Sequence, residues 1–441
     1  MAVRIRNTRP RRRVRTPGHG DRRIGRQFRG DSRIVPRLEP WRRNFLAVWP
    51  SLFVVSAGLL AFVPTLPLYL RDRFGIVAED EVRLWSGLAF GAAPLAAAIT
   101  GPIWGALGDR HGRKPMALRA IFGVAAVTWA MPLASTPLML VILRFVQGLL
   151  AGYVAPAMAL VSADTPAARQ GVVIGRLQIA IAVGLLFGPV LGAEIAIALG
   201  REAVFRVTSV MAFVAAVPVW FGAVEDRAAL AERRQRDPTG MFAAMAGFLR
   251  EPLVGSLLVT FFLARFAVQM IETFVALWVE ELGPPSWVVA ATPTAAVDRT
   301  TGIAFSMLAI AQILFTGFWG RRGDRHGPLR CMVVLTTGLG AVLLVTAFVP
   351  AIEGFLALRA LAAVFLAGLM PLAYAALAKR VDPARRSLGF ACLQSGMQLG
   401  MCGGPLLGGV VSAAFGIEGL FVTAAVVLFW AAAWMARLRN R

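Results

Sequence analysis

Long apolar runs separated by short polar segments dominate the chain. A helix needs roughly 20 apolar residues to cross the hydrocarbon core of a bilayer. The runs lack the alternation of apolar and polar positions that membrane β-strands show, so we expect an all-α membrane protein. They predict 12 transmembrane helices at residues 44–70, 84–107, 116–135, 137–161, 172–199, 205–224, 252–279, 300–320, 329–350, 353–378, 387–413 and 417–436.

Landmark residues repeat between the first six predicted helices and the last six. Because each set has six helices, both begin on the same side of the membrane, and the repeat is parallel. Parallel repeats of this kind are typical of secondary transporters, with a binding site near the midplane where the repeats face each other. The repeated pairs are Asp109 and Asp324, Arg144 and Arg359, and Pro156 and Pro371, each 215 residues apart, and Pro189 and Pro405, 216 apart.

Composition and charge agree with a membrane protein. Hydrophobic residues make up 57% of the 441 residues and charged residues 16%, against about 25% charged in soluble domains. The net charge of +22 does not indicate nucleic-acid binding, because 15 arginines lie in residues 1–43 and the others cluster at helix ends. We expect a basic disordered cytoplasmic tail (1–43), an N-terminal half (44–224), a cytoplasmic linker (225–251), a C-terminal half (252–436) and a cytoplasmic C-terminus (437–441).

The basic residues also predict the orientation. The loops after the even-numbered helices, the helix ends next to them and the C-terminus carry 22 Lys/Arg, whereas the loops after the odd-numbered helices and their adjoining helix ends carry six. Positive charge marks the cytoplasmic side, so both termini are expected there. Arginine far outnumbers lysine, which favours a GC-rich bacterium and its inner membrane. The tail itself reads as a solvated arm, a lipid-binding segment or an organelle transit peptide.

Enzyme motifs are missing from the sequence. Cys331, Cys392 and Cys402 have neither metal-binding spacing nor a disulfide pattern, and there is no phosphate loop, catalytic triad or dinucleotide fingerprint. We expect a protein that is not an enzyme and needs no metal or cofactor.

The segment 105–114 has the pattern G-x-x-x-D-R-x-G-R-K. Asp109 can accept hydrogen bonds from a helix N-terminus, and Gly112 can adopt the positive φ of a tight turn. This pattern resembles the loop between helices 2 and 3 of the major facilitator superfamily. The resemblance implies a cytoplasmic gate, which is weaker in the second half because Pro328 and Leu329 replace the last two basic residues. The gate residues are Gly105, Asp109, Arg110, Gly112, Arg113, Asp324 and Arg325.

Glycines recur every four residues on the fifth and eleventh predicted helices. This spacing places them on one face, where two backbones can touch, and Pro189 and Pro405 favour a kink there. The fifth helix also resembles the antiporter motif of the drug:proton exporters in this superfamily, although Ala193 stands where a second glycine is common. The stripe consists of Gly184, Gly188 and Gly192 on one helix and Gly400, Gly404 and Gly408 on the other.

Charged residues within the predicted helices are candidates for proton coupling. An arginine in lipid costs at least about 2.5–3.5 kcal/mol, so Arg144 and Arg359 should face the interior; a snorkelling Arg144 is the alternative. Arg144 and Gln147 belong to an R-x-x-Q-G sequence that resembles the helix-4 motif of the same exporters, whose arginine is linked to proton transfer.

Glutamate is the residue type within the predicted helices that can carry the proton, because His111 and His326 fall in the loops between them. Arg265, Gln269 and Glu272 share one helix face at i, i+4 and i+7. The carrier is therefore expected to be Glu272 or Glu194. In the alternative interpretation, each glutamate only forms a static ion pair, Arg359–Glu272 or Arg144–Glu194.

Together these features predict two pseudo-symmetric six-helix halves, the major facilitator fold. The resemblance implies export of small lipophilic or amphipathic drugs in exchange for protons by alternating access. Transport of one metabolite, such as a sugar or organic anion, and a non-transporting sensor are the alternatives. The expected partners are the substrate, protons and the lipid bilayer, with no nucleic acid and a monomeric state. Candidate lining residues are Phe145, Tyr153, Phe274, Trp278, Phe365 and Tyr374.

Overall fold

The computed structural model describes residues 39–166, 169–225, 252–379, 381 and 386–439. Residues 1–38 of the expected tail and 226–251 of the expected linker lie outside that part. Every regular element among the described residues is helical. In chain order these are α1 (Pro40–Ala61), α2 (Leu66–Phe74), α3 (Glu79–His111), α4 (Arg113–Ala130), the 3-10 turn η1 (Met131–Leu133), α5 (Pro137–Leu150), α6 (Val154–Ala163), α7 (Gln170–Leu199), α8 (Arg201–Gly222), α11 (Pro252–Glu272), α12 (Val275–Leu282), α13 (Pro293–His326), α14 (Pro328–Thr346), α15 (Ile352–Ala378) and α16 (Arg386–Arg439).

The twelve predicted crossings are all present. In the described part, 11 helical segments are long and apolar enough to cross a membrane. The last of them holds two crossings, because α16 has a non-helical residue, Gly416, with φ of 73°. Three crossings consist of two shorter helices each: α1 with α2, α5 with α6, and α11 with α12.

The three helix breaks differ in how well the sequence predicted them. The break at residues 62–65 contains Pro64, and Pro67 follows directly after it; two prolines this close together favour a bend or break in a helix. The break at 151–153 contains Gly152, whose φ of 110° lies in a region that side-chain-bearing residues rarely adopt. Neither this break nor the one at 273–274 was predicted. Pro189 and Pro405, by contrast, lie inside continuous helices.

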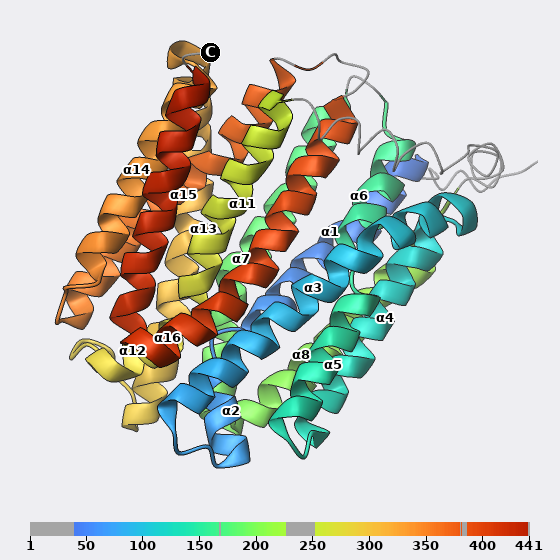
Figure 1. The fold of residues 1–441 in the computed structure, drawn as a ribbon. Helices are drawn as coiled ribbons and strands as arrows, with labels where there is room; N and C mark the ends of the chain where they lie inside the picture. Colours follow the sequence, from blue (N-terminus) through green and yellow to red (C-terminus); the bar gives the residue numbers. More distant parts are fainter. Residues whose placement is uncertain (1–38, 167–168, 226–251, 380, 382–385, 440–441) are drawn as a thin grey trace, which may run out of the picture. The chain divides into compact units, whose positions relative to one another are not determined.

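The halves are built in the same way. In the first half α1 packs on α7 and α8, and α3 packs on α5; in the second half α11 packs on α16, and α13 packs on α15. Figure 1 shows these two sets side by side, with α3 against α16 and α7 against α13 between them. We call the end where α1 and α11 begin the linker end. The opposite end, which carries α2 and α12, is the α2–α12 end.

The repeated charged segments are more helical than expected. Asp109 and Arg110 belong to the last turn of α3, which runs to His111, and α13 likewise runs through Asp324 to His326. The assignment of these residues, and of both histidines, to loops was therefore wrong. The connection to the next helix is a single glycine in each half: Gly112 with φ of 108° and Gly327 with φ of 87°. The expected positive φ of Gly112 is confirmed.

Candidate functional site

A buried ion pair lies inside the second half. Arg359 on α15 donates from Nη2 to Glu272 Oε2 at 2.7 Å, and the two side chains are only 5% and 12% exposed. Arg359 also donates from Nε to the carbonyl oxygen of Ala304 on α13 at 2.7 Å. The guanidinium lies 5.3 Å from the ring centre of Phe305. An arginine in lipid is stabilised by such pairing, so this pair can remain charged within the bundle.

Arg144 occupies the equivalent place in the first half. It donates from Nε to the carbonyl oxygen of Ala89 at 3.1 Å. Arg359 lies 215 positions after Arg144, and Ala304 lies 215 positions after Ala89. The same bond therefore occurs in both halves. Arg144 is 6% exposed, which excludes a snorkelling position. Its other partner is neutral: the amide oxygen of Gln147, whose nitrogen donates to Thr128 Oγ1 at 2.8 Å.

A third arginine lies near the acidic pair. Arg265 on α11 donates from Nη2 to Gln269 Oε1 at 3.3 Å, so the predicted shared face is present for these two residues. Its Nε is buried without a hydrogen-bond partner. Beside Glu272 and Arg359 lies a cavity of about 30 Å³, which has room for about one water molecule. The three arginines thus have one glutamate between them as an acidic partner: Glu272, which pairs with Arg359.

Glu194 is not part of this interior site. Arg299 of α13 donates to both of its carboxylate oxygens, at 2.7 and 2.8 Å, and the Glu194 side chain is 46% exposed. The alternative of an Arg144–Glu194 pair was wrong, because Glu194 lies near the α2–α12 end of α7, where the other half supplies its partner. Glu194 therefore links the halves.

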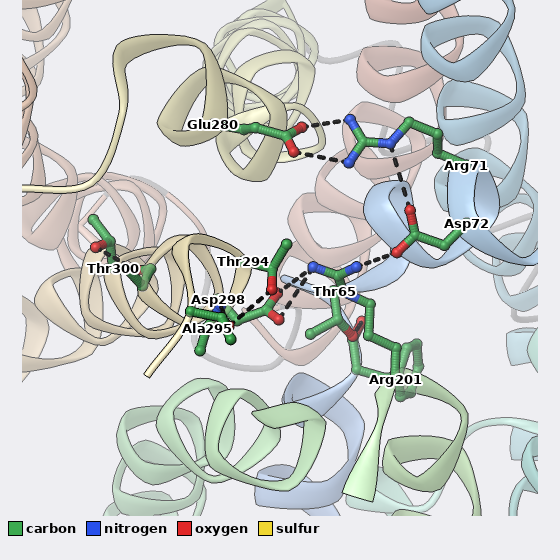
Figure 2. Close-up of polar contacts among 12 residues, drawn as sticks. Thr65, Arg71, Asp72, Arg201, Glu280, Thr294, Ala295, Asp298 and Thr300 are labelled. Carbon is green, nitrogen blue, oxygen red and sulfur yellow. Dashed lines mark hydrogen bonds and ion pairs between the residues drawn. The ribbon is translucent and has the colours of Figure 1, made fainter. Parts of the chain in front are cut away.

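A chain of charges connects the two halves at the α2–α12 end (Figure 2). Arg71 on α2 donates to both oxygens of Glu280 on α12, at 2.6 and 2.8 Å. These bonds raise the pKa of the Arg71 guanidinium. Arg201 at the start of α8 donates at 3.1 Å to both oxygens of Asp298 on α13. Asp72, between them, contacts both arginines.

The glycine stripes lie within the halves. A Cβ on Gly188 would be 2.5 Å from the carbonyl oxygen of Ala57 on α1, and one on Gly404 would be 2.5 Å from that of Phe266 on α11. Both distances are shorter than real Cβ contacts, so the predicted backbone approach is confirmed. Each of these contacts joins two helices of the same half, so this face does not form the interface between the halves. The remaining stripe glycines, Gly184, Gly192, Gly400 and Gly408, also pack against α1, α11 or the adjoining Phe274.

Among the described residues, other glycines bring the two halves into contact toward the α2–α12 end. A Cβ on Gly87 of α3 would be 2.5 Å from the carbonyl oxygen of Pro405 on α16, and Gly91 is also tightly packed. Gly101 and Gly105 lie 14 residues further along, on nearly the same face of α3. Neither has an atom within 4 Å of such a Cβ. The halves are therefore in contact at the α2–α12 end and separated along α3 toward the linker end.

The motif segment at the linker end is held by a residue that the sequence did not reveal. Glu225, which follows α8, accepts the backbone N–H groups of Arg113 and Lys114 at 2.8 and 3.1 Å. A carboxylate at a helix N-terminus is stabilising, and this role was predicted for Asp109, whose side chain lies outside the described residues. Arg113 also donates to the carbonyl oxygen of Ala159 at 2.6 Å. In the second half, Asp324 pairs with Lys379 at 3.2 Å.

The predicted aromatic lining divides into two groups. Tyr153, Phe274 and Trp278 are buried in the cores of the halves, and Tyr153 donates to Ser51 Oγ at 2.7 Å. These three do not face open space in this conformation, contrary to expectation. They were chosen for apolar character, which core and cavity residues share. The half-buried residues are Phe145, Phe365 and Tyr374.

Comparison with known proteins identifies the class. A family model described as Major Facilitator Superfamily matches residues 48–297 and 295–441. The chain is 30% identical to multidrug resistance protein MdtG of Proteus mirabilis over 398 residues, covering 90% of this chain and 96% of the relative. It is 31% identical to MdtG of Yersinia enterocolitica, covering 90% and 93%. The chain belongs to the Major Facilitator Superfamily and is a multi-pass membrane protein.

A solved structure has the same arrangement of helices. The inward-facing, occupied form of a bacterial homologue of the human lysosomal transporter Spinster has a TM-score of 0.73 and 16% sequence identity. The alignment covers 91% of this chain and 97% of that one. At this identity the likeness concerns the fold alone, and it agrees with two six-helix halves.

The charge chain of Figure 2 is the part that sequence reasoning missed. In the sequence its members resemble ordinary charged residues at the ends of predicted helices. One feature of the sequence could have indicated it: the first half carries two arginines and the second half two carboxylates in loops or helix ends on the same side of the membrane. The members are Arg71, Asp72, Arg201, Glu280 and Asp298.

Proposed function

We propose that this protein is a secondary active transporter that exports small lipophilic or amphipathic compounds in exchange for protons. The observation that carries the proposal is the Glu272–Arg359 pair, a titratable carboxylate buried among apolar helices with water-sized space beside it. The two relatives carry multidrug resistance names, which supports drugs as the substrate class.

We further propose that the linker end faces the cytoplasm of a bacterial inner membrane. The positive charge of the loops at that end supports this orientation. The described conformation, joined at the α2–α12 end and separated along α3 toward the linker end, is then open to the inside. A compound would enter from the cytoplasm, and the opposite opening would release it outside, which is alternating access.

Glu272 is the group that exchanges the proton. When its carboxylate binds a proton, an O–H bond forms, the ion pair with Arg359 loses its charge attraction, and Arg359 keeps its bond to Ala304. When Glu272 releases the proton to the inner water, the ion pair forms again. The neutral partners of Arg144 do not bind or release a proton, so the charge of that site stays fixed. We propose that the protein is no enzyme, works as a monomer and needs no cofactor besides the proton gradient.

Transport by purified protein in vesicles with an imposed pH gradient tests this proposal. We expect uptake of a cationic dye into inverted vesicles, driven by internal acid. Glu272→Gln should reduce gradient-driven uptake to the level of protein-free vesicles. The matched variant Glu194→Gln should retain coupling, because Glu194 only joins the halves. Wild-type coupling in Glu272→Gln would remove the role from this residue.

A second candidate is transport of one defined organic anion. The specific observation that favours it is the excess of three interior arginines over one glutamate, because Arg144 and Arg265 have only neutral partners in their hydrogen bonds. The same vesicles, given an organic anion instead of the dye, distinguish the two. Gradient-driven movement of the anion without movement of the dye would favour this candidate.

A further inference from the structure

The α2–α12 end carries more carboxylates than arginines. In the charge chain of Figure 2, two arginines face three carboxylates, which leaves one negative charge in excess. The whole end shows the same imbalance, with six arginines and eleven carboxylates. The arginines are Arg71, Arg73, Arg83, Arg201, Arg206 and Arg299, and the carboxylates are Asp72, Glu79, Asp80, Glu81, Glu194, Glu202, Glu280, Glu281, Asp298, Glu353 and Glu418.

Asp298 is the most buried carboxylate of the charge chain. Its side chain is 6% exposed, against 32% for Glu280 and 49% for Asp72. Burial disfavours the charged form of a carboxylate unless a cation fully compensates it. Its cation, Arg201, also serves Asp72, so one guanidinium is shared between two carboxylates. A cavity of about 590 Å³, lined by Asp72, Arg201 and Asp298, gives water and protons access to this site.

Asp298 also differs from its neighbours in what it connects. Arg201 and Asp72 both belong to the first half, whereas Asp298 belongs to the second. When the α2–α12 end opens, Arg201 keeps Asp72 as a partner, and Asp298 loses its contact and becomes hydrated. The charged groups around Asp298 come from three helices and line or border the same cavity: Arg71, Asp72 and Arg73 from α2, Arg201 and Glu202 from α8, and Glu280 from α12. The adjacent Arg299 is bound to Glu194 of α7.

We propose that Asp298 is a second proton-binding residue, which takes up a proton from the outer side when the α2–α12 end closes. The bound proton cancels the excess negative charge that closure would otherwise bury. In the open state Asp298 is hydrated and charged, so the closed state binds the proton more tightly. Acid outside therefore favours closure, by at most about tenfold per pH unit for one proton. The inference rests on the proposed orientation and alternating access, but it does not require the proton exchange proposed for Glu272.

The test measures closure directly, in the full-length protein and without substrate. Spin labels on Val77→Cys and Val289→Cys report the separation of the two halves at this end; both side chains are exposed, by 94% and 82%. The native cysteines are at most 6% exposed and should remain unlabelled. Distance distributions in lipid nanodiscs between pH 8 and pH 5 should show a rising short-distance population.

Asp298→Asn mimics the protonated form, so it should give a short-distance population that does not change with pH. Asp298→Glu keeps a carboxylate and should restore the pH dependence, which shows that the site is still folded. Glu281→Gln is the matched control at the same end, chosen because burial and then the nearby Glu418 raise the pKa of Glu281; it should keep the pH dependence.

Three results would overturn the proposal. The first is a wild-type distance distribution that is insensitive to pH, or that opens in acid. The second is a wild-type pH response in Asp298→Asn. The third is loss of the response in Glu281→Gln or Glu272→Gln, which would assign the proton to another carboxylate. A failure of Glu272 in the transport assay leaves this measurement unaffected, so the two proposals stand or fall separately.

Discussion

Arg144 and Arg359 occupy equivalent places in the two halves and have different partners. Each donates to a carbonyl oxygen of the neighbouring helix, at Ala89 and Ala304 respectively. The first half completes the site with the neutral Gln147, and the second completes it with Glu272. A protonation change can therefore alter the charge of the second site only. The comparison indicates that the repeat kept the scaffold in both halves and placed the titratable chemistry in one.

Replacing each arginine should reveal the difference between the neutral site of Arg144 and the acidic site of Arg359, and we expect this to be the largest effect. Arg359→Met leaves a buried, unpaired Glu272, which should lower the free energy of unfolding by about 3–5 kcal/mol. Arg144→Met leaves only neutral polar groups unpaired and should cost about 1–3 kcal/mol. Thermal and denaturant unfolding of the purified variants measures both costs.

A double variant provides the control for that comparison. Glu272→Gln together with Arg359→Met removes the unpaired charge and should recover part of the lost stability. Equal costs for Arg144→Met and Arg359→Met, with no recovery in the double variant, would mean that the acidic partner makes no difference.

The packed and open glycines form a second comparison. Gly188→Ala places a methyl group 2.5 Å from the carbonyl oxygen of Ala57, so α1 and α7 must separate. We expect a loss of about 1–3 kcal/mol, as in other overpacked sites. Gly101→Ala meets open space and should be neutral or stabilising by up to about 1 kcal/mol through helix propensity. The unfolding curves should therefore show a loss of stability for Gly188→Ala alone, and a similar loss in both variants would contradict the open face of α3.

Glu225 distinguishes the linker ends of the two halves. It accepts two backbone N–H groups at the start of α4, whereas α14 in the other half begins with Pro328, which has no N–H group. Glu225→Ala should cost about 1–2 kcal/mol, the range of a lost helix cap. Glu353→Ala, an acidic residue in the first turn of α15, is the control and should change the unfolding midpoint less. If both variants behave alike, Glu225 has no special part in holding the motif segment.

Sequence alone predicted the fold because each crossing is a local apolar run and the repeat confirms the set. It also predicted the close glycine packing and, as one alternative, the pair of Arg359 with Glu272, because burial of charge in lipid demands a partner. The charge chain could not be found this way. Arg71 and Glu280 are 209 residues apart, and only the relative placement of the two halves brings such helix-end charges together.

Trp104 and Trp319 offer the finest test, because they make the same bond in both halves. Their indole N–H groups donate to the carbonyl oxygens of Leu149 at 2.6 Å and Val364 at 2.8 Å. Leu149 lies next to the end of α5, where carbonyl groups have no helical donor. Val364 lies inside the continuous α15, where its carbonyl oxygen also accepts a backbone N–H group of the helix.

Trp104→Phe should therefore cost more than Trp319→Phe, whose expected cost is about 0.5–1.5 kcal/mol. Trp104 also supports Arg119, whose guanidinium lies 3.5 Å from the ring centre. A phenyl ring preserves part of that contact, so we expect an additional cost of about 0.5–1 kcal/mol in the first half. Parallel unfolding measurements on the two variants resolve this difference. A larger cost for Trp319→Phe would show that the break in the fourth crossing does not depend on Trp104 for its hydrogen bonding.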